Sequence, residues 1–253
     1  MSLDSQKTSL LAGTIGLAYM RIREILTWNS GIRLLIVFAV VFVVHLLVGI
    51  KTDSSRFWVT AIDLTLLGFL PFYCLVKGGE SLRSEIRDGT IEYCWTRPAS
   101  KASLYFGYYI SSIIGILLFT FVCLAAVFFA ALSLGDIESF VSLVRIAIGG
   151  LAIALSFSAL SSALGAITQK FVIVGIIYHL IVEKLIGNLP TLASRISILK
   201  NLKFQLYSIP EYPMELDQPA ILLDYGNILI ITLVAIALGI AVFTSKKYAI
   251  GSE

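Results

Sequence analysis

The sequence predicts an all-α integral membrane protein with six transmembrane helices, and three observations carry this prediction. Of the 253 residues, 58% are hydrophobic and only 14% are charged, whereas soluble domains carry about 25% charged residues. Six apolar runs reach or approach the length of about 20 residues that a membrane span requires. The charged residues gather between these runs. We therefore interpret residues 1–253 as a single transmembrane domain.

The first expected element is an amphipathic helix over residues 9–28. Apolar side chains recur there at three- and four-residue spacing, which is one face of a helix: Leu11, Ile15, Ala18, Ile22 and Leu26. Arg21, Arg23 and Glu24 interrupt the run, so we expect this helix to lie on the membrane surface with Trp28 at headgroup level. The alternative is an ordinary helix packed on a soluble partner.

The six spans follow in order, and we expect them at residues 34–50, 57–76, 104–132, 141–167, 171–187 and 226–243. Two long polar segments separate them, a charged loop at 77–103 and a segment at 188–225. In the second segment, Leu192 to Leu206 predicts a short helix at the outer interface. An extended acidic connector with three prolines is expected after it. This helix either gates a pathway or belongs to a loop that shields the fold.

The basic residues predict the orientation in the membrane, because cytoplasmic loops carry more Lys and Arg. If the N-terminus is cytoplasmic, twelve of the 19 basic residues lie on the inner side. We therefore expect a protein of the plasma membrane with both termini in the cytoplasm. The charged loop 77–103 is then cytoplasmic, and the segment 188–225 lies outside.

Four ionisable side chains inside the spans are candidates for function, because charges in a membrane are costly: His45, Asp63, His179 and Glu183. His45 and Asp63 lie at similar depth on either side of the first turn, and we expect a structural pair rather than a proton relay. His179 and Glu183 are four residues apart on one helical face. They either face a substrate or reach the outer surface by snorkelling.

The fourth span carries small residues at an unbroken four-residue interval, the pattern that lets helices approach closely in lipid: Gly150, Ala154, Ser158, Ser162 and Ala166. We call this set the small-residue stripe. It predicts a tight helix contact, either within the chain or across a dimer.

Several classes of protein are disfavoured by what the sequence lacks. It contains no GxxxxGK[ST] phosphate loop, no HExxH or GxSxG motif and no paired Cys/His cluster. Its three cysteines form no disulfide framework, and no basic patch is interleaved with aromatic residues as in nucleic-acid binders. We expect a protein that is not itself an enzyme and that holds no cofactor or metal of its own.

The charged loop 77–103 has a local structure that its residues predict. Leu82 and Ile86 lie on one face of a helix from Glu80 to Asp88, and Gly89 is expected to cap its C-terminus. Thr90 is positioned to begin a second short helix, Ile91–Trp95, which ends before Pro98. The loop is therefore expected to form a compact cytoplasmic knob.

These residues resemble the first cytoplasmic loop of the membrane subunits of type-2 ABC exporters, the permeases that export drugs, peptides and polysaccharides. The family has an acidic residue, then Gly-Thr-hydrophobic-Glu, then Pro with small or basic residues. This chain has Glu85, then Gly89-Thr90-Ile91-Glu92, then Arg97-Pro98-Ala99-Ser100-Lys101. Cys94-Trp95-Thr96 departs from the aliphatic residues that are more common in the family.

The resemblance implies a permease that forms a translocation pathway as a homodimer or heterodimer. Two separate P-loop ATPase subunits would bind ATP and Mg²⁺ and would contact this chain through its loop. The expected docking residues are Arg83, Glu85, Arg87, Asp88, Gly89, Thr90, Ile91, Glu92, Tyr93 and Trp95. The alternative is a membrane enzyme or an assembly factor that recruits a soluble partner through the same loop.

Overall fold

The computed structural model describes residues 27–51, 54–89, 100–135, 140–189, 192–207 and 218–246, together with Gly16, Tyr19 and Arg23. These residues form helices and contain no strand. Six helices in the described part of the chain are long and apolar enough to cross a membrane. The prediction of an all-α, multi-pass membrane protein is thereby confirmed at this level.

The first two spans are α2 (Trp28–Lys51) and a composite helix. The composite helix consists of α3 (Ser54–Ala61), the π-helix η1 (Ile62–Phe69), α4 (Leu70–Gly78) and α5 (Glu80–Arg87). Most of the expected interfacial helix 9–28 lies outside the described residues. Gly16, Tyr19 and Arg23 are helical and exposed, and Trp28 begins the first span.

The third and fourth spans are long and regular, and the fifth is not. They comprise α7 (Lys101–Ser133) and α8 (Phe140–Ile167), followed by α9 (Phe171–Tyr178), the π-helix η2 (His179–Leu185) and the 3₁₀-helix η3 (Ile186–Asn188). The 3₁₀-helix η4 (Leu192–Ile196) and α10 (Ile198–Tyr207) lead to the sixth span, α11 (Gln218–Ser245). Neither π-helix was predicted from the sequence, because periodicity over short apolar runs does not separate π from α turns.

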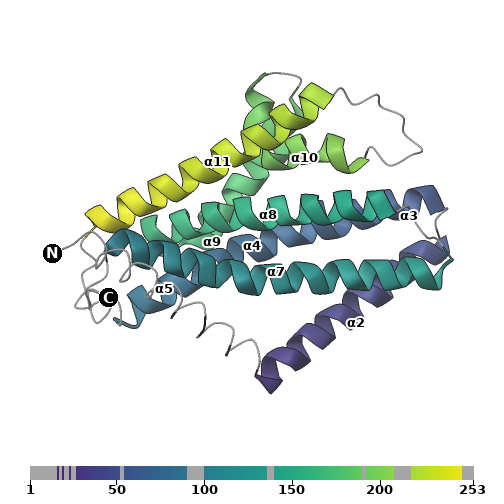
Figure 1. Cartoon of the computed structure of the whole chain (residues 1–253), viewed down its shortest axis with the longest axis horizontal. Coiled ribbons are helices and arrows are strands. Elements are labelled where there is room, and N and C mark those ends of the chain that lie inside the picture. Colours follow the sequence, from purple (N-terminus) through teal and green to yellow (C-terminus); the bar gives the residue numbers. More distant parts are fainter. Residues whose placement is uncertain are drawn as a thin grey trace.

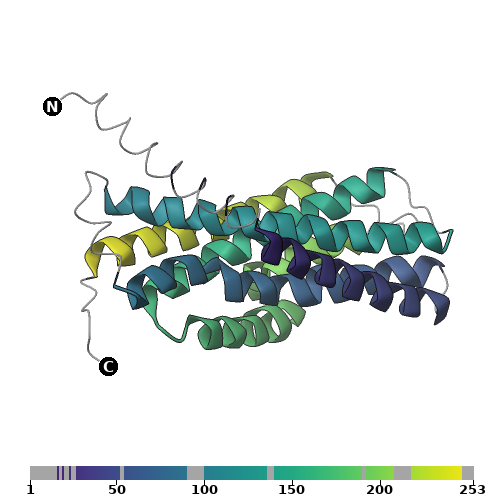
Figure 2. The same ribbon diagram turned by 90° about the horizontal axis from the view of Figure 1, so that it is seen from below.

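The helices form an elongated bundle in which α7 and α8 run side by side along its length (Figure 1). α4 packs between them, and α11 crosses them obliquely. α2 contacts α7 near one end of the bundle and diverges from it towards its own N-terminus (Figures 1 and 2). We call the end with α5 and the start of α7 the loop end. The opposite end, where α2 ends and α3 begins, is the hairpin end.

One large apolar core fills the middle of the bundle, and a smaller one lies at the loop end. The large core joins side chains of the second, third and fourth spans with α10, and Tyr73 stacks on Phe119 within it at a ring-centroid distance of 3.5 Å. The smaller core brings Leu82 of α5 against Tyr105, Tyr108 and Phe243. The loop end is therefore packed by residues from four different helices.

The small-residue stripe of α8 packs against the second and third spans of the same chain. A Cβ atom at Gly150 would lie 3.2 Å from Thr120 Cγ2 and 3.4 Å from Leu66 Cδ2. Further along the stripe, Ser158 and Ser162 lie against Gly78 of the second span. Of the two possibilities left open by the sequence, the structure shows the contact within one chain.

The segment between the fifth and sixth spans differs from the expected single helix, and most of the expected extended connector lies outside the described residues. The apolar pattern from Leu192 to Leu206 is split at Ser197 into η4 and α10. The helix α11 begins at Gln218, so Pro219 lies in a helix and not in the expected extended connector, and the part that could cross a membrane is Leu223–Ser245, where residues 226–243 were expected. Proline suits the first turn of a helix, where its missing N–H is not needed.

Replacing Gly150 with leucine should destabilise the protein by about 1–3 kcal/mol, the usual cost of overpacking a well-packed site. The added side chain would collide with Thr120 and Leu66. Thermal unfolding in detergent measures the effect, and Leu151→Ala on the exposed face of the same helix is the control. A Gly150→Leu protein as stable as the control variant would contradict the close contact.

Candidate functional site

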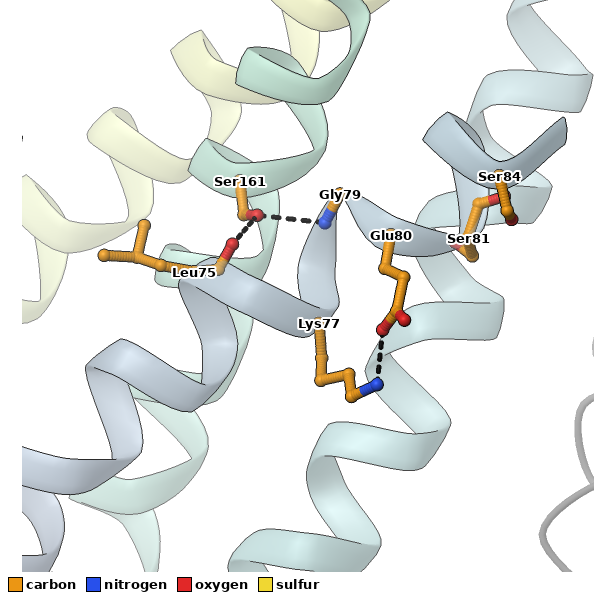
Figure 3. A network of polar contacts seen from close by, with 7 residues as sticks. All are labelled: Leu75, Lys77, Gly79, Glu80, Ser81, Ser84 and Ser161. Atoms are coloured by element: carbon orange, nitrogen blue, oxygen red, sulfur yellow. Dashed lines mark hydrogen bonds and ion pairs between the residues drawn. The ribbon is translucent and has the colours of Figure 1, made fainter. Parts of the chain in front are cut away.

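The junction between the second span and the charged loop is built around one serine of the fourth span. In an uninterrupted α-helix, the N–H of Gly79 would bond to the carbonyl of Leu75, four residues earlier. Instead, the Ser161 hydroxyl lies between them. It donates to Leu75 O at 2.5 Å and accepts from Gly79 N at 2.9 Å (Figure 3). A side chain inserted in this way is a recognised cause of helix kinks.

A second hydroxyl of α8 completes the junction. Ser162 donates to the carbonyl of Gly78 at 2.8 Å. Two adjacent serines thus satisfy backbone groups that the break between α4 and α5 would leave unpaired in a buried place. Because unpaired buried backbone groups are costly, the bend is stable only while the fourth span stays in contact with it.

Glycine is required at this junction by the closeness of the two backbones. A Cβ atom at Gly78 would lie 2.8 Å from Ser161 Cβ and 2.9 Å from Ser158 Cα. At Gly79 it would lie 2.7 Å from the Ser161 carbonyl oxygen. These distances are too short for any side chain, so the pair of glycines permits the contact that the serines then hold.

α5 leaves this junction as an anchored helix. Its Leu82 side chain is buried in the small core at the loop end, with Ile86 partly buried beside it. Ser81 Oγ donates to Tyr108 O of α7 at 3.2 Å, and Lys77 pairs with Glu80 at 2.5 Å across the bend (Figure 3). α5 is therefore tied to both the second and the third span.

The opposite face of α5 carries its charges. Arg87 and Asp88 are exposed and bonded to one another at 3.1 Å, while Arg83 and Glu85 are half-buried. Gly89 follows with a φ of +71°, the left-handed conformation that commonly ends a helix. The helix thus ends where the sequence predicts. Of the expected docking residues, Thr90, Ile91, Glu92, Tyr93 and Trp95 lie outside the described part of the chain.

His45 has a different partner from the one expected. It is buried, and its Nδ1 lies 2.7 Å from the Val41 carbonyl oxygen, so that nitrogen carries a proton and donates. Nε2 is then free to accept from the Thr65 hydroxyl at 3.0 Å. Both ring nitrogens are satisfied in this way, and the exposed side chain of Asp63 is not part of the pair.

His179 and Glu183 both lie in the π-helix η2 and are both buried. The imidazole of His179 packs against Phe72, with ring centroids 4.5 Å apart, and more distantly against Phe157. Among the described residues neither of its ring nitrogens has a hydrogen-bond partner. Glu183 is held by four hydrogen bonds from Tyr178 and from residues near the start of α10. Neither side chain reaches the surface by snorkelling.

Sequence reasoning missed the residues that hold these groups, namely Thr65, Ser161, Tyr178 and Ser197. One signal was available for Ser161, because a Gly-Gly pair at the end of one span and a Ser-Ser pair late in another are complementary. The others occur as ordinary polar residues without a pattern. In the described part of the chain, no group of His, Cys, Asp or Glu side chains is arranged to hold a metal ion.

Comparison of the chain with models of known protein families finds no match, and a search of curated proteins finds none either.

Replacing Ser161 with alanine should lower the free energy of unfolding by about 1–3 kcal/mol, because buried backbone groups of Leu75 and Gly79 lose their partner. Ser133→Ala is the matched control, since Ser133 is exposed and bonds only within its own helix. Denaturant unfolding of both variants gives the comparison. Equal stability of the two variants would show that the Ser161 bridge contributes nothing.

Thr65 and His45 should behave as a coupled pair. Thr65→Val removes the donor to Nε2, and His45→Phe leaves the Thr65 hydroxyl without this acceptor. Each single change should cost about 1–3 kcal/mol, and the double variant should cost less than the sum. Thermal unfolding of the three variants provides the double-mutant cycle. Strictly additive losses would mean that the two side chains do not interact.

Proposed function

We propose that this chain is the permease subunit of an ATP-driven exporter of the type-2 ABC class. The observation that supports this most is the combination found at the end of the second span. A short charged helix, anchored to the span by a bend, leads directly into the Gly89-Thr90-Ile91-Glu92 motif. Six helices able to cross a membrane provide the rest of a permease.

The anchoring of α5 suits the transmission of movement. Leu82 is buried between helices, so α5 does not swing freely on the bend. A push on its charged face would reach the second span through Gly79, the fourth span through Ser161 and the third span through Ser81. In this proposal, closure of a partner ATPase moves α5 and thereby changes the packing of three spans.

The charges on α5 suit contact with a soluble partner. Arg87 and Asp88 are a solvent-exposed pair, which contributes little to the stability of the chain itself. Groups of this kind are available for ion pairs across an interface, where they favour the correct partner. The sequence has no phosphate loop, so ATP and Mg²⁺ belong to the partner ATPase subunits in this proposal.

The proposed assembly has two permease subunits, identical or related, and two ATPase subunits. The pathway then lies between the permeases in the plasma membrane. Both termini and the loop 77–103 lie on the cytoplasmic side, in agreement with the distribution of Lys and Arg. The segment with η4 and α10 then faces the outside.

Reversing the charge of the docking face should weaken the complex. We expect Arg87→Glu and Glu92→Arg each to reduce recovery of the P-loop ATPase with the affinity-purified permease by about tenfold. The reason is that loss of one ion pair at an interface weakens the affinity by roughly that factor. Co-expression, pull-down and ATP hydrolysis by the recovered complex provide the measurements. The control is Lys184→Glu, because Lys184 is also exposed and lies near the end of the fifth span that is far from the charged loop, and it should leave ATPase recovery unchanged.

Three results would contradict the proposal. If the chain is purified alone and neither recruits nor stimulates a P-loop ATPase, it is not a permease of this class. If the docking variants lose membrane insertion as well as ATPase recovery, the charged face serves folding instead. A chain that is fully active without any ATPase would favour the alternative of a membrane enzyme or assembly factor.

A further inference from the structure

Glu183 is a buried carboxylate with an unusually complete set of donors. Its side chain is 4% exposed. It accepts from Ser197 Oγ at 2.6 Å, from Leu199 N at 2.9 Å, from Tyr178 Oη at 3.0 Å and from Ile198 N at 3.2 Å. A charge inside a membrane-spanning bundle persists only when it is satisfied in this way.

Two of these donors are the first backbone N–H groups of α10. The first N–H groups of a helix have no partner inside the helix, and the positive end of the helix dipole lies there. Ser197 already caps α10 by accepting from Lys200 N at 3.0 Å. Glu183 adds a second cap from another helix, through both of its side-chain oxygens. The start of α10 is thus attached to the fifth span by its hydrogen bonds to Glu183, and Lys200 of α10 also donates to Leu189 O, just after that span, at 3.2 Å.

The π-helix of the fifth span is what allows Tyr178 to take part. On an α-helix with about 3.6 residues per turn, positions five apart lie about 140° from one another. In a π-helix the backbone bonds join residues five apart, so these positions come close together. The fifth span is π-helical from His179 to Leu185, and the Tyr178 hydroxyl reaches Glu183 as a result. An irregular backbone and the buried carboxylate therefore belong to one arrangement.

α10 extends from this attachment into the core of the bundle. Ile198, Leu202 and Leu206 are buried in the main apolar core. Leu206 touches the fourth span so closely that a Cβ atom at Gly149 would lie 2.7 Å from its Cδ2. At the other end, a Cβ atom at Gly187 would lie 2.8 Å from Ser197 Oγ. The helix therefore joins the fifth span to the fourth.

We propose that Glu183 is a positioning residue that locks α10 to the fifth span, so that the two move as one body. When Glu183 is removed, α10 should separate from the fifth span and lose its place against α8.

Hydrogen exchange of the full-length protein in lipid nanodiscs tests the attachment. Glu183→Gln keeps the shape but replaces one acceptor oxygen with a donor, so two of the four donors lose their acceptor. Amides in the peptide covering 198–207 should exchange at least about tenfold faster, while peptides of α7 remain unchanged. Lys184→Gln, at the adjacent exposed position, should leave the exchange of 198–207 as in the parent protein.

A second variant keeps the test valid if Glu183→Gln does not fold. Tyr178→Phe removes one donor only, so it should accelerate exchange at 198–207 less than Glu183→Gln does. Glu183→Asp should give an exchange rate between those of the parent protein and Glu183→Gln. Unchanged exchange at 198–207 in both Tyr178→Phe and Glu183→Asp, or faster exchange throughout the chain, would overturn the proposal.

Discussion

The rest of the structure depends on the Ser161 hydroxyl that lies between the Leu75 carbonyl and the Gly79 N–H. This one group replaces the helical hydrogen bond at the point where the second span turns into α5. It requires glycine at two successive positions and small residues along α8, because the backbones must approach closely. It also sets the direction of α5, and hence which face of that helix is buried at the loop end.

A second contact of the same kind lies towards the hairpin end, where a side chain again satisfies backbone groups of a different helix. Glu183 accepts hydrogen bonds from the first N–H groups of α10. In the same way, Ser161 bonds to the backbone of the second span where the helical hydrogen bonds of that span are interrupted. In both places the donor or acceptor comes from the fourth or fifth span and the segment held is short. Short helices are marginal by themselves, so α5 and α10 depend on these contacts for their position.

Both arrangements put polar groups inside an apolar bundle, where their main effect is to specify which helices pack together. Apolar packing in lipid does not choose strongly between helix pairings, since lipid tails are as apolar as leucine. The hydroxyls, the carboxylate and the pair of His45 with Thr65 each require particular partners at hydrogen-bond distance. They therefore select a single register between the packed helices.

The sequence alone determined the six apolar spans, the helix from Glu80 with Leu82 and Ile86 on one face and the stripe on α8, because each follows from the period of one helix. It also placed the end of that helix at Gly89, because glycine readily adopts the left-handed conformation that ends a helix. The tertiary structure decided the rest. Ser161 and Leu75 are 86 residues apart in the chain, and a periodic pattern describes one helix without naming its neighbour. For the same reason Asp63 was expected beside His45 where Thr65 lies: similar depth was predictable, whereas the π turn that aims Thr65 inward was not.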